Sequence, residues 1–421
     1  MKSGFQIAVL LAFLFSFAHT LFALYPPEPQ SGGTYIYAKG TKSAEDYRAQ
    51  GRTGRPTTDY YYGKGIKTGA LTLRPMVGYA GEFDSNVYFE DNDADEDYIN
   101  RLVWGVDADV PFNYKGEHKI FAGVQNQYEW FVKEGSQDHA DWLFQGGGQF
   151  NFAPFSLEIY EEYKDTSERS GSELLQRVER DENFISGILT IPLSEMFIET
   201  EVNDYNIAFE DSAFDNRDRN EFAVFPRLGV NVGTRTQVLA EYGYRNLNYD
   251  ENVFSGDANQ VALGLRGFAG QGDLVSYQIW GGYEFIDYDN SSREGYNGFI
   301  VRGQAIYRLN ERTKIIADGN RRAVESISST GLYFVRNEVS LKLRQQIAER
   351  LFGSVRALGG WNQYVTSRDD WYWDPGLGLE YVLPGNIVSI FAEYRFTGRE
   401  SDAANSDYMR HLATLGVKAE V

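Results

Sequence analysis

Residues 332–344 have the sequence LYFVRNEVSLKLR, in which apolar and polar side chains alternate along most of the stretch. Successive side chains of a β-strand point to opposite faces of the sheet, so this stretch is expected to form a strand that is apolar on one side only. The apolar face carries Val335, Val339, Leu341 and Leu343, and the opposite face carries Arg336, Glu338, Ser340, Lys342 and Arg344. Residues 120–130 and 235–245 repeat the pattern. The sequence therefore predicts β-strands with one apolar and one charged face.

The segments between these strands alternate in length. Eight short turns are expected near residues 111–116, 152–154, 192–195, 233, 269–273, 309–311, 348–350 and 383–385. Nine longer polar loops are expected near residues 81–97, 131–138, 166–180, 210–218, 248–256, 287–293, 324–331, 365–370 and 398–405. Short periplasmic turns and long extracellular loops are typical of outer-membrane barrels. We therefore predict an all-β, antiparallel, up-and-down transmembrane β-barrel of 18 strands over residues 70–421, with 16 strands as the alternative.

The two ends of the predicted sheet should pair with each other. A soluble β-sandwich would show the same alternation of side chains, but it rarely needs so many strands. In a membrane every backbone N–H and C=O group must be paired, and an antiparallel sheet achieves this only by closing on itself. We expect the strand near residues 70–79 to pair with the strand near residues 407–420. The last eight residues, TLGVKAEV, are similar to the C-terminal signal that the barrel-assembly machinery recognises.

The N-terminal residues predict secretion. Lys2 precedes an apolar stretch at residues 7–18, and Ala23 provides a small residue at a cleavage site, so residues 1–23 are expected to be a signal peptide. Residues 24–69 are rich in Pro, Gly and polar residues and predict a periplasmic extension or a plug. The formal net charge of −20 disfavours nucleic acid as a partner. The absence of Cys from the sequence excludes disulfide bonds.

A barrel of this size leaves an aqueous lumen, so the polar faces of the strands should line it. The candidate lumen charges are Asp107, Asp109, Glu129, Glu158, Glu199, Arg235, Arg245, Arg302, Arg336, Lys342, Arg344 and Arg356. The acids come from the first half of the chain and the bases from the second half. We hypothesise a transverse electric field across the lumen. The alternative is that these charges pair with charges on neighbouring strands.

Two features of the sequence are candidates for a metal or catalytic site. Residues 82–97 hold eight acids and no base. Alternate carboxylates can bind Ca²⁺, but acidic runs are more often solvated surfaces. His139, beside Asp138 and Asp141, is the candidate for catalysis near a loop. No metal-ligand spacing, phosphate-binding loop or nucleophile motif accompanies it, so we expect no cofactor and no enzymatic activity.

Aromatic residues gather before and after the loop near residues 365–370. Trp361 and Trp373 fit the aromatic girdle that outer-membrane barrels carry at the membrane interface. Tyr372 has the opposite orientation and is the candidate saccharide contact. Aromatic faces can stack against sugar rings, which makes this residue relevant to transport of carbohydrates.

Residues 78–88, GYAGEFDSNVY, would end the first strand and open the acidic loop. This stretch resembles the start of the outer-membrane β-barrel porin family that includes EpsL-type proteins, which are often encoded with exopolysaccharide biosynthesis genes. The resemblance implies a pore that exports an exopolysaccharide together with a periplasmic polysaccharide export protein. The other partners expected are outer-membrane lipids and lipopolysaccharide. The alternatives are a general or small-solute diffusion porin and a non-conducting structural barrel.

Overall fold

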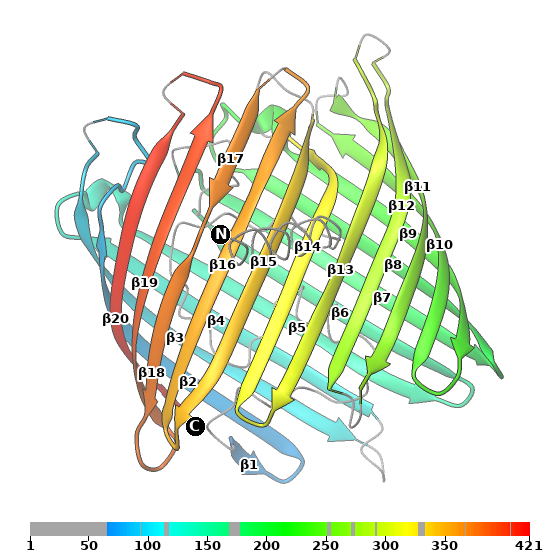
Figure 1. The fold of residues 1–421 in the computed structure, drawn as a ribbon, viewed down its shortest axis with the longest axis horizontal. Helices are drawn as coiled ribbons and strands as arrows, with labels where there is room; N and C mark the ends of the chain where they lie inside the picture. Colours follow the sequence, from blue (N-terminus) through cyan, green and yellow to red (C-terminus); the bar gives the residue numbers. More distant parts are fainter. Residues whose placement is uncertain are drawn as a thin grey trace, which may run out of the picture.

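The computed structural model describes residues 65–421, except residues 93, 113–117, 168–176, 251–253, 271–273, 291–292, 327–332, 367 and 405. The signal peptide expected at residues 1–23 and most of the extension expected at residues 24–69 lie outside the described residues. Within the described residues, one antiparallel sheet closes on itself and forms a barrel (Figure 1). This part of the chain contains no helix that is long and apolar enough to cross a membrane.

Successive strands pair with each other around the barrel. Their bounds are β1 Ile66–Thr68, β2 Leu71–Asp84, β3 Asp97–Phe112, β4 His118–Phe131, β5 His139–Phe152, β6 Phe155–Thr166, β7 Arg180–Leu193, β8 Met196–Phe209, β9 Arg219–Val232, β10 Thr236–Tyr249, β11 Gly256–Ala269, β12 Val275–Tyr288, β13 Tyr296–Asn310, β14 Thr313–Glu325, β15 Tyr333–Ala348, β16 Leu351–Tyr364, β17 Asp369–Trp373, β18 Gly376–Val382, β19 Val388–Ser401 and β20 Tyr408–Glu420. Two short 3-10 helices, η1 Gly135–Gln137 and η2 Asp215–Arg217, lie in loops.

The predicted strand number is confirmed within the described residues. β17 and β18 are two pieces of one wall strand, because both pair with β16 on one side and with β19 on the other. β1 is an added strand at the start of β2. The remaining strands, with β17 and β18 taken together, make an 18-stranded wall. Its short turns and long loops alternate as expected from the sequence.

The first and last wall strands pair from Met76↔Glu420 to Asp84↔Leu412, which confirms the expected closure. The buried carboxylate of Asp84 accepts hydrogen bonds from Arg410 on β20. Ser85 donates its backbone N–H to the carbonyl of His411, and its hydroxyl oxygen accepts the backbone N–H of His411. The side chain of Asn86 donates to the carbonyl of Met409. The Asp-Ser-Asn segment of the family-like stretch therefore fastens the end of the first wall strand to the last one.

The sheet begins slightly before residue 70, where the barrel was expected to start. β1 turns into β2 through Gly69, whose φ of +63° is one that glycine adopts without strain. β1 pairs with Leu71–Leu73 of β2. The pairing of β20 with β2 begins only at Met76, so these first residues of β2 lack β20 as a partner. β1 therefore continues the sheet at the point where the last strand ends.

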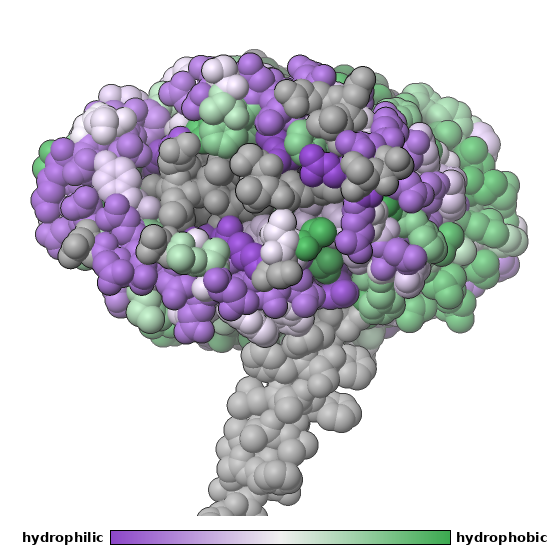
Figure 2. All heavy atoms as spheres, turned by 90° about the horizontal axis from the view of Figure 1, so that it is seen from above, coloured by the Kyte–Doolittle hydropathy of each residue, from purple (hydrophilic) through white to green (hydrophobic). Residues whose placement is uncertain are grey.

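The two faces of the wall differ in polarity. Leu263 and Leu415 have outward side chains that are 68% and 64% exposed. Such an apolar outer surface is the one a barrel presents to lipid. Outward Trp pairs include Trp361 and Trp371, whose ring centroids lie 5.1 Å apart. Figure 2 shows mostly hydrophilic residues on the rim at the loop end and hydrophobic residues along part of the outer side.

Candidate functional site

The inner face of the barrel is the candidate functional site because it carries the charged half of the alternating pattern. In β8, Glu199, Glu201 and Asn203 are buried inside the barrel. Ile198 and Val202, which alternate with them, are 42% and 39% exposed on the outside. This orientation follows from the two-residue period of a strand. The charged side chains pack against one another within the lumen.

Asp107 and Asp109 lie near the turn end of β3, on the lumen face. Asp107 accepts a hydrogen bond of 3.4 Å from the Nε2 of Gln145 on β5. Asp109 forms ion pairs with Arg74 on β2 and with Lys119 on β4, the latter at 3.8 Å. Each base comes from a strand directly beside β3. The charge of Asp109 is therefore balanced on its own part of the wall.

Glu129 on β4 shares Arg101, a fully buried arginine of β3, with Glu82 on β2. The Nη2 of Arg101 lies 2.8 Å from a carboxylate oxygen of Glu82, and its Nε donates to Glu129. Arg101 was not among the predicted lumen charges. Its spacing from the buried residues Ile99 and Val103 places it on the inner face, so strand parity was the signal that would have identified it.

Glu199 belongs to a network of charges that reaches across several strands. Arg227 on β9 binds Glu199 and Glu201 at 2.7 Å and Glu241 on β10 at 2.6 Å. Glu241 also accepts hydrogen bonds of 2.5 Å from Arg302 on β13. Three steps between strands span about 14 Å along the wall. The long side chains of Arg302 and Glu241 therefore bridge β10 and β13 across the inner face of the wall.

Three more of the predicted lumen charges, Glu158, Arg344 and Arg356, also lie on strands of the barrel wall. Glu158 on β6 is half-buried two residues before the buried Tyr160. Arg344 forms an ion pair of 3.2 Å with Glu380, and Arg356 forms one of 2.7 Å with Asp374. These ion pairs join strands that are neighbours or next neighbours in the wall.

Three further predicted bases differ in their surroundings. The guanidinium of Arg336 is buried above the ring of Phe334, 5.4 Å from its centroid. Lys342 is exposed and lies opposite Arg356 in the register of β15 and β16. Arg235 is not on a wall strand, which corrects its assignment to the lumen wall. It lies in the turn between β9 and β10 and donates to the carbonyl of Gly270, because the turn ends the alternation there.

The ion pairs bear on the hypothesis of a transverse field. The acids of the first strands have bases such as Arg74 and Arg101 beside them, and the later bases have acids such as Glu241 and Glu380 beside them. A paired charge produces a much weaker field at a distance than a free one. These contacts favour the local-pairing alternative, and a transverse field stays a hypothesis.

The outer ends of β14 and β15 leave the wall and lie inside the barrel. The pairing of β13 with β14 stops at Val301↔Arg321, although β13 extends to Tyr296 and β14 to Glu325. β14 and β15 stay paired with each other up to Glu325↔Tyr333. By strand parity Glu325 and Tyr333 belong to the outward face. They nevertheless contact the lumen side chains of β10 and β12, which places the β14–β15 end inside this part of the wall.

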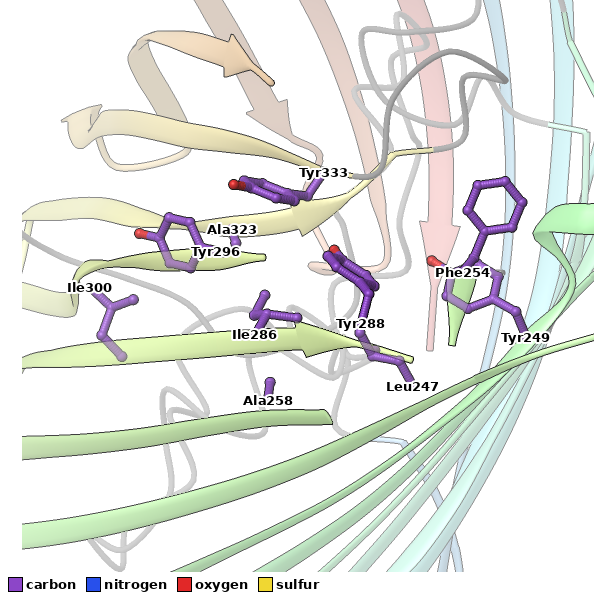
Figure 3. Close-up of a cluster of buried hydrophobic side chains, with 10 residues drawn as sticks. All are labelled: Leu247, Tyr249, Phe254, Ala258, Ile286, Tyr288, Tyr296, Ile300, Ala323 and Tyr333. Atoms are coloured by element: carbon purple, nitrogen blue, oxygen red, sulfur yellow. The ribbon is translucent and has the colours of Figure 1, made fainter. Parts of the chain in front are cut away.

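Two side chains fasten the β14–β15 end to the wall. Glu325 accepts hydrogen bonds from the hydroxyls of Tyr249 and Tyr288 at 3.3 and 3.2 Å, and lies 3.7 Å from Arg245. Tyr333 is stacked on Tyr288, with ring centroids 6.3 Å apart, and it donates to the carbonyl of Gly295 at 3.2 Å. Figure 3 shows these tyrosines converging from the wall and from β15. This end narrows the outer half of the lumen.

Arg245, another predicted lumen base, connects the fastened end to the wall. It lies 3.3 Å from Glu221 on β9 and 3.4 Å from Glu284 on β12, in addition to its contact with Glu325 on β14. The sequence predicted the lumen position of Arg245 but not the inward end of β14 and β15. Of the long loop expected near residues 166–180, residues 168–176 lie outside the described residues.

Tyr372 is buried on the lumen face of β17. Its hydroxyl donates to Glu338 on β15 at 2.9 Å. A side chain at Gly360 would collide with the Tyr372 hydroxyl, so Gly360 leaves room for the ring against β16. Trp361 and Trp371 lie on the opposite face, where they stack on each other. A saccharide contact at Tyr372 stays a prediction.

His139 lies at the loop end of β5 among charged groups. Its Nε2 is 2.8 Å from Arg177, 3.4 Å from Glu129 and 3.6 Å from Asp141. Its expected neighbour Asp138 instead accepts the backbone N–H of Phe131. The imidazole therefore lies among the charged side chains that line the lumen mouth.

The acidic loop is fastened to the following loop. Asp97 accepts the backbone N–H groups of Lys133 and Glu134 at 3.0 and 2.8 Å. Tyr88 donates to Glu134, and this hydrogen bond raises the pKa of the Tyr88 hydroxyl above its usual value. Among the described residues, no group of three or more His, Asp or Glu side chains is placed to hold a metal ion.

The chain was compared with protein-family models, with curated protein sequences and with solved structures. The model of a family described as "Putative beta-barrel porin 2" matches residues 59–421. No curated protein sequence gives a significant match. Similar solved structures include OccK2 (OpdF) of Pseudomonas aeruginosa, which is 12% identical, with 83% of this chain and 97% of that chain covered and a TM-score of 0.49. A BenF-like porin from Pseudomonas fluorescens is 10% identical, with 83% and 99% covered and a TM-score of 0.47. At these identities the likeness is one of fold alone.

Proposed function

The chain belongs to the "Putative beta-barrel porin 2" family, and from this premise we propose that it is an outer-membrane channel for small hydrophilic solutes. The observation that supports this function best is the polar, ion-paired lining of the lumen, with pairs such as Arg227 with Glu241 and Arg101 with Glu82. Polar side chains keep a lumen hydrated, and paired charges add little net attraction for either sign of ion. Neutral solutes and small solutes with a single charge therefore suit this lining.

The β14–β15 end supports a size limit for the solute. It lies inside the wall of β10–β13, where Tyr333 and Glu325 contact wall residues. A solute that passes the outer half of the lumen must pass beside this end or displace it. Because each contact is a side-chain contact with modest energy, occasional displacement is expected.

Export of an exopolysaccharide with a periplasmic export protein is the second candidate. The tyrosines Tyr249, Tyr288, Tyr296 and Tyr333 near the outer end of the lumen support it, since aromatic faces and hydroxyls can contact sugar rings. A continuous polymer strand would need the β14–β15 end to be displaced for the whole time of export. Tyr372 would be a further contact of the same chemical kind.

Conductance and solute uptake test these functions. The refolded mature chain is inserted into planar bilayers and, in parallel, into liposomes exposed to sugars from monosaccharides to long oligosaccharides. Stable conductance with uptake limited to small sugars supports the small-solute channel. Uptake of long oligosaccharides at rates near those of monosaccharides would instead favour export. A barrel with no conductance would contradict both and favour a structural role.

The N-terminal extension requires a separate test, because the sequence predicts it to be either a plug or a docking segment. Deleting residues 24–64 leaves β1 in place. Conductance that rises on deletion supports a plug. Unchanged conductance contradicts the plug and favours docking of a periplasmic partner.

A further inference from the structure

A small cavity lies where β14 separates from β13. Its volume is about 40 Å³, and its lining includes Trp280, Glu284, Ile300, Arg302 and Arg322. Ile300 is the first β13 residue beyond the last pair with β14, Val301↔Arg321. A buried water needs about 10–15 Å³ of such space. The cavity therefore has room for roughly three waters, or for a single carboxylate group, but not for a sugar ring.

Two side chains of the lining have hydrogen-bond donors that the described residues leave unused. Trp280 is 2% exposed, and its indole Nε1 has no hydrogen-bond partner in the described structure. Arg302 uses its Nη2 for Glu241, and no hydrogen bond of its Nη1 or Nε is found within the described strands and loops. The indole N–H of Trp280 is buried without an acceptor, which is unfavourable, so an oxygen-bearing occupant is favourable here.

The position of Trp280 is set by its neighbours. A Cβ at Gly264 would come within 2.5 Å of the indole, so only glycine allows the ring to lie against β11. The guanidinium of Arg302 lies 4.7 Å from the centre of the indole, and that of Arg227 lies 5.4 Å from it. Cations above an indole are held by the ring quadrupole. With both cations on the ring, the N–H edge is the part of Trp280 that offers a contact to a solute.

The charge of the lining favours an anion. Four arginines line it, Arg245, Arg302, Arg321 and Arg322, and the lining holds one carboxylate, that of Glu284. Glu221 and Glu325 pair with Arg245 from outside the lining. Glu284 is itself 3.4 Å from Arg245. Glu241 beyond the lining is shared between Arg227 and Arg302, and Gln260 also donates to it. Charge-assisted hydrogen bonds to a carboxylate are about twice as strong as neutral ones.

We propose that this cavity binds the carboxylate group of a small organic anion in transit, through the Trp280 indole N–H and the free N–H groups of Arg302. The site deepens the proposed channel function and rests on it. The carboxylate would sit at the base of the β14–β15 end, where the solute passes. A solute with a carboxylate would then be retained longer in the lumen than its neutral amide.

The test follows the indole N–H signals of the refolded mature chain in detergent by NMR. The seven tryptophans give separate indole signals, and the Trp280→Phe variant identifies that of Trp280. Titration uses sodium acetate against acetamide at constant ionic strength. The expected result is a saturable shift of the Trp280 signal with acetate and none with acetamide. Arg302→Gln should weaken acetate binding by about tenfold or more, since it removes charge-assisted hydrogen bonds.

Several outcomes would overturn the site. No saturable shift with acetate indicates a cavity occupied by water only. Equal shifts with acetate and acetamide, or an unchanged affinity in Arg302→Gln, would rule out carboxylate recognition. Trp361→Phe is the matched control, because Trp361 lies on the outward face, and it should leave acetate binding unchanged. Bilayer conductance of the same preparations tests the channel separately, so failure of the site and failure of the channel function are distinguishable.

Discussion

Replacing Tyr333 by Ala removes the largest side chain that holds the β14–β15 end inside the barrel. The variant loses the stacking on Tyr288, the edge contact with Tyr296 at 5.5 Å between ring centroids, and the hydrogen bond to Gly295. Truncation of a buried aromatic residue costs about 3–5 kcal/mol. Because these contacts exist only when the end is docked, the ratio of undocked to docked conformations should rise about 100-fold or more. The channel should then spend a larger fraction of time with the β14–β15 end undocked and the outer half of the lumen wider.

Single-channel recording in planar bilayers measures this change. We expect the Tyr333→Ala variant to visit a higher conductance level far more often than the wild type and to admit larger sugars in the liposome assay. Tyr242→Ala is the matched control, because Tyr242 faces outward and is 47% exposed. Retention of the folded form on gels without heating shows that the variant is folded. A folded Tyr333→Ala variant with wild-type conductance levels and an unchanged sugar size limit would refute the argument that this end narrows the channel.

The remaining predictions concern the ion pairs. Arg101→Met leaves the buried carboxylates of Glu82 and Glu129 without their shared arginine, so the free energy of unfolding in urea should fall by about 3–5 kcal/mol. A loss below about 1 kcal/mol would contradict a structural role for this arginine. Arg410→Met removes the partner of Asp84 where β2 and β20 close the barrel. The fraction of the protein that refolds into the heat-resistant barrel should drop, because a buried carboxylate is left unpaired. An undiminished yield of refolded protein would mean that backbone pairing alone closes the barrel. The wild-type channel should show a small reversal potential in a salt gradient, because its charges are paired. Charge reversal at Arg336, Lys342 and Arg344 should shift it toward cation selectivity, and an unchanged value would exclude the transverse field.

The locations of paired charges could be predicted only in part. Strand parity identifies the lumen face, and it placed Glu129, Arg245 and Arg302 there. The same parity places Arg101 on the lumen face, although it was not among the predicted lumen charges. The partner of each charge is harder to predict because neighbours in the wall come from different strands. The ion pair between Arg302 and Glu241 joins β13 to β10, and no sequence pattern predicts that these two side chains meet.

The inward end of β14 and β15 has no sequence signal of its own. Glu325 and Tyr333 fall on the outward parity of their strands, and a wall built by parity alone would place them on the outside. Packing against Tyr249 and Tyr288 reverses this assignment. The break in pairing after Val301↔Arg321 is a property of the folded wall.

The sequence by itself determined the class of fold, the number of wall strands, their closure and the face that most side chains of the wall occupy. These features follow from the two-residue period of β-strands, from the spacing of turns and from the need to pair every backbone group in a membrane. Only the tertiary structure decided which charges neutralise each other, where the lumen narrows and where an unused donor such as that of Trp280 is enclosed. The physical reason is that these properties depend on the curvature of the wall, which brings together side chains from strands that are not neighbours.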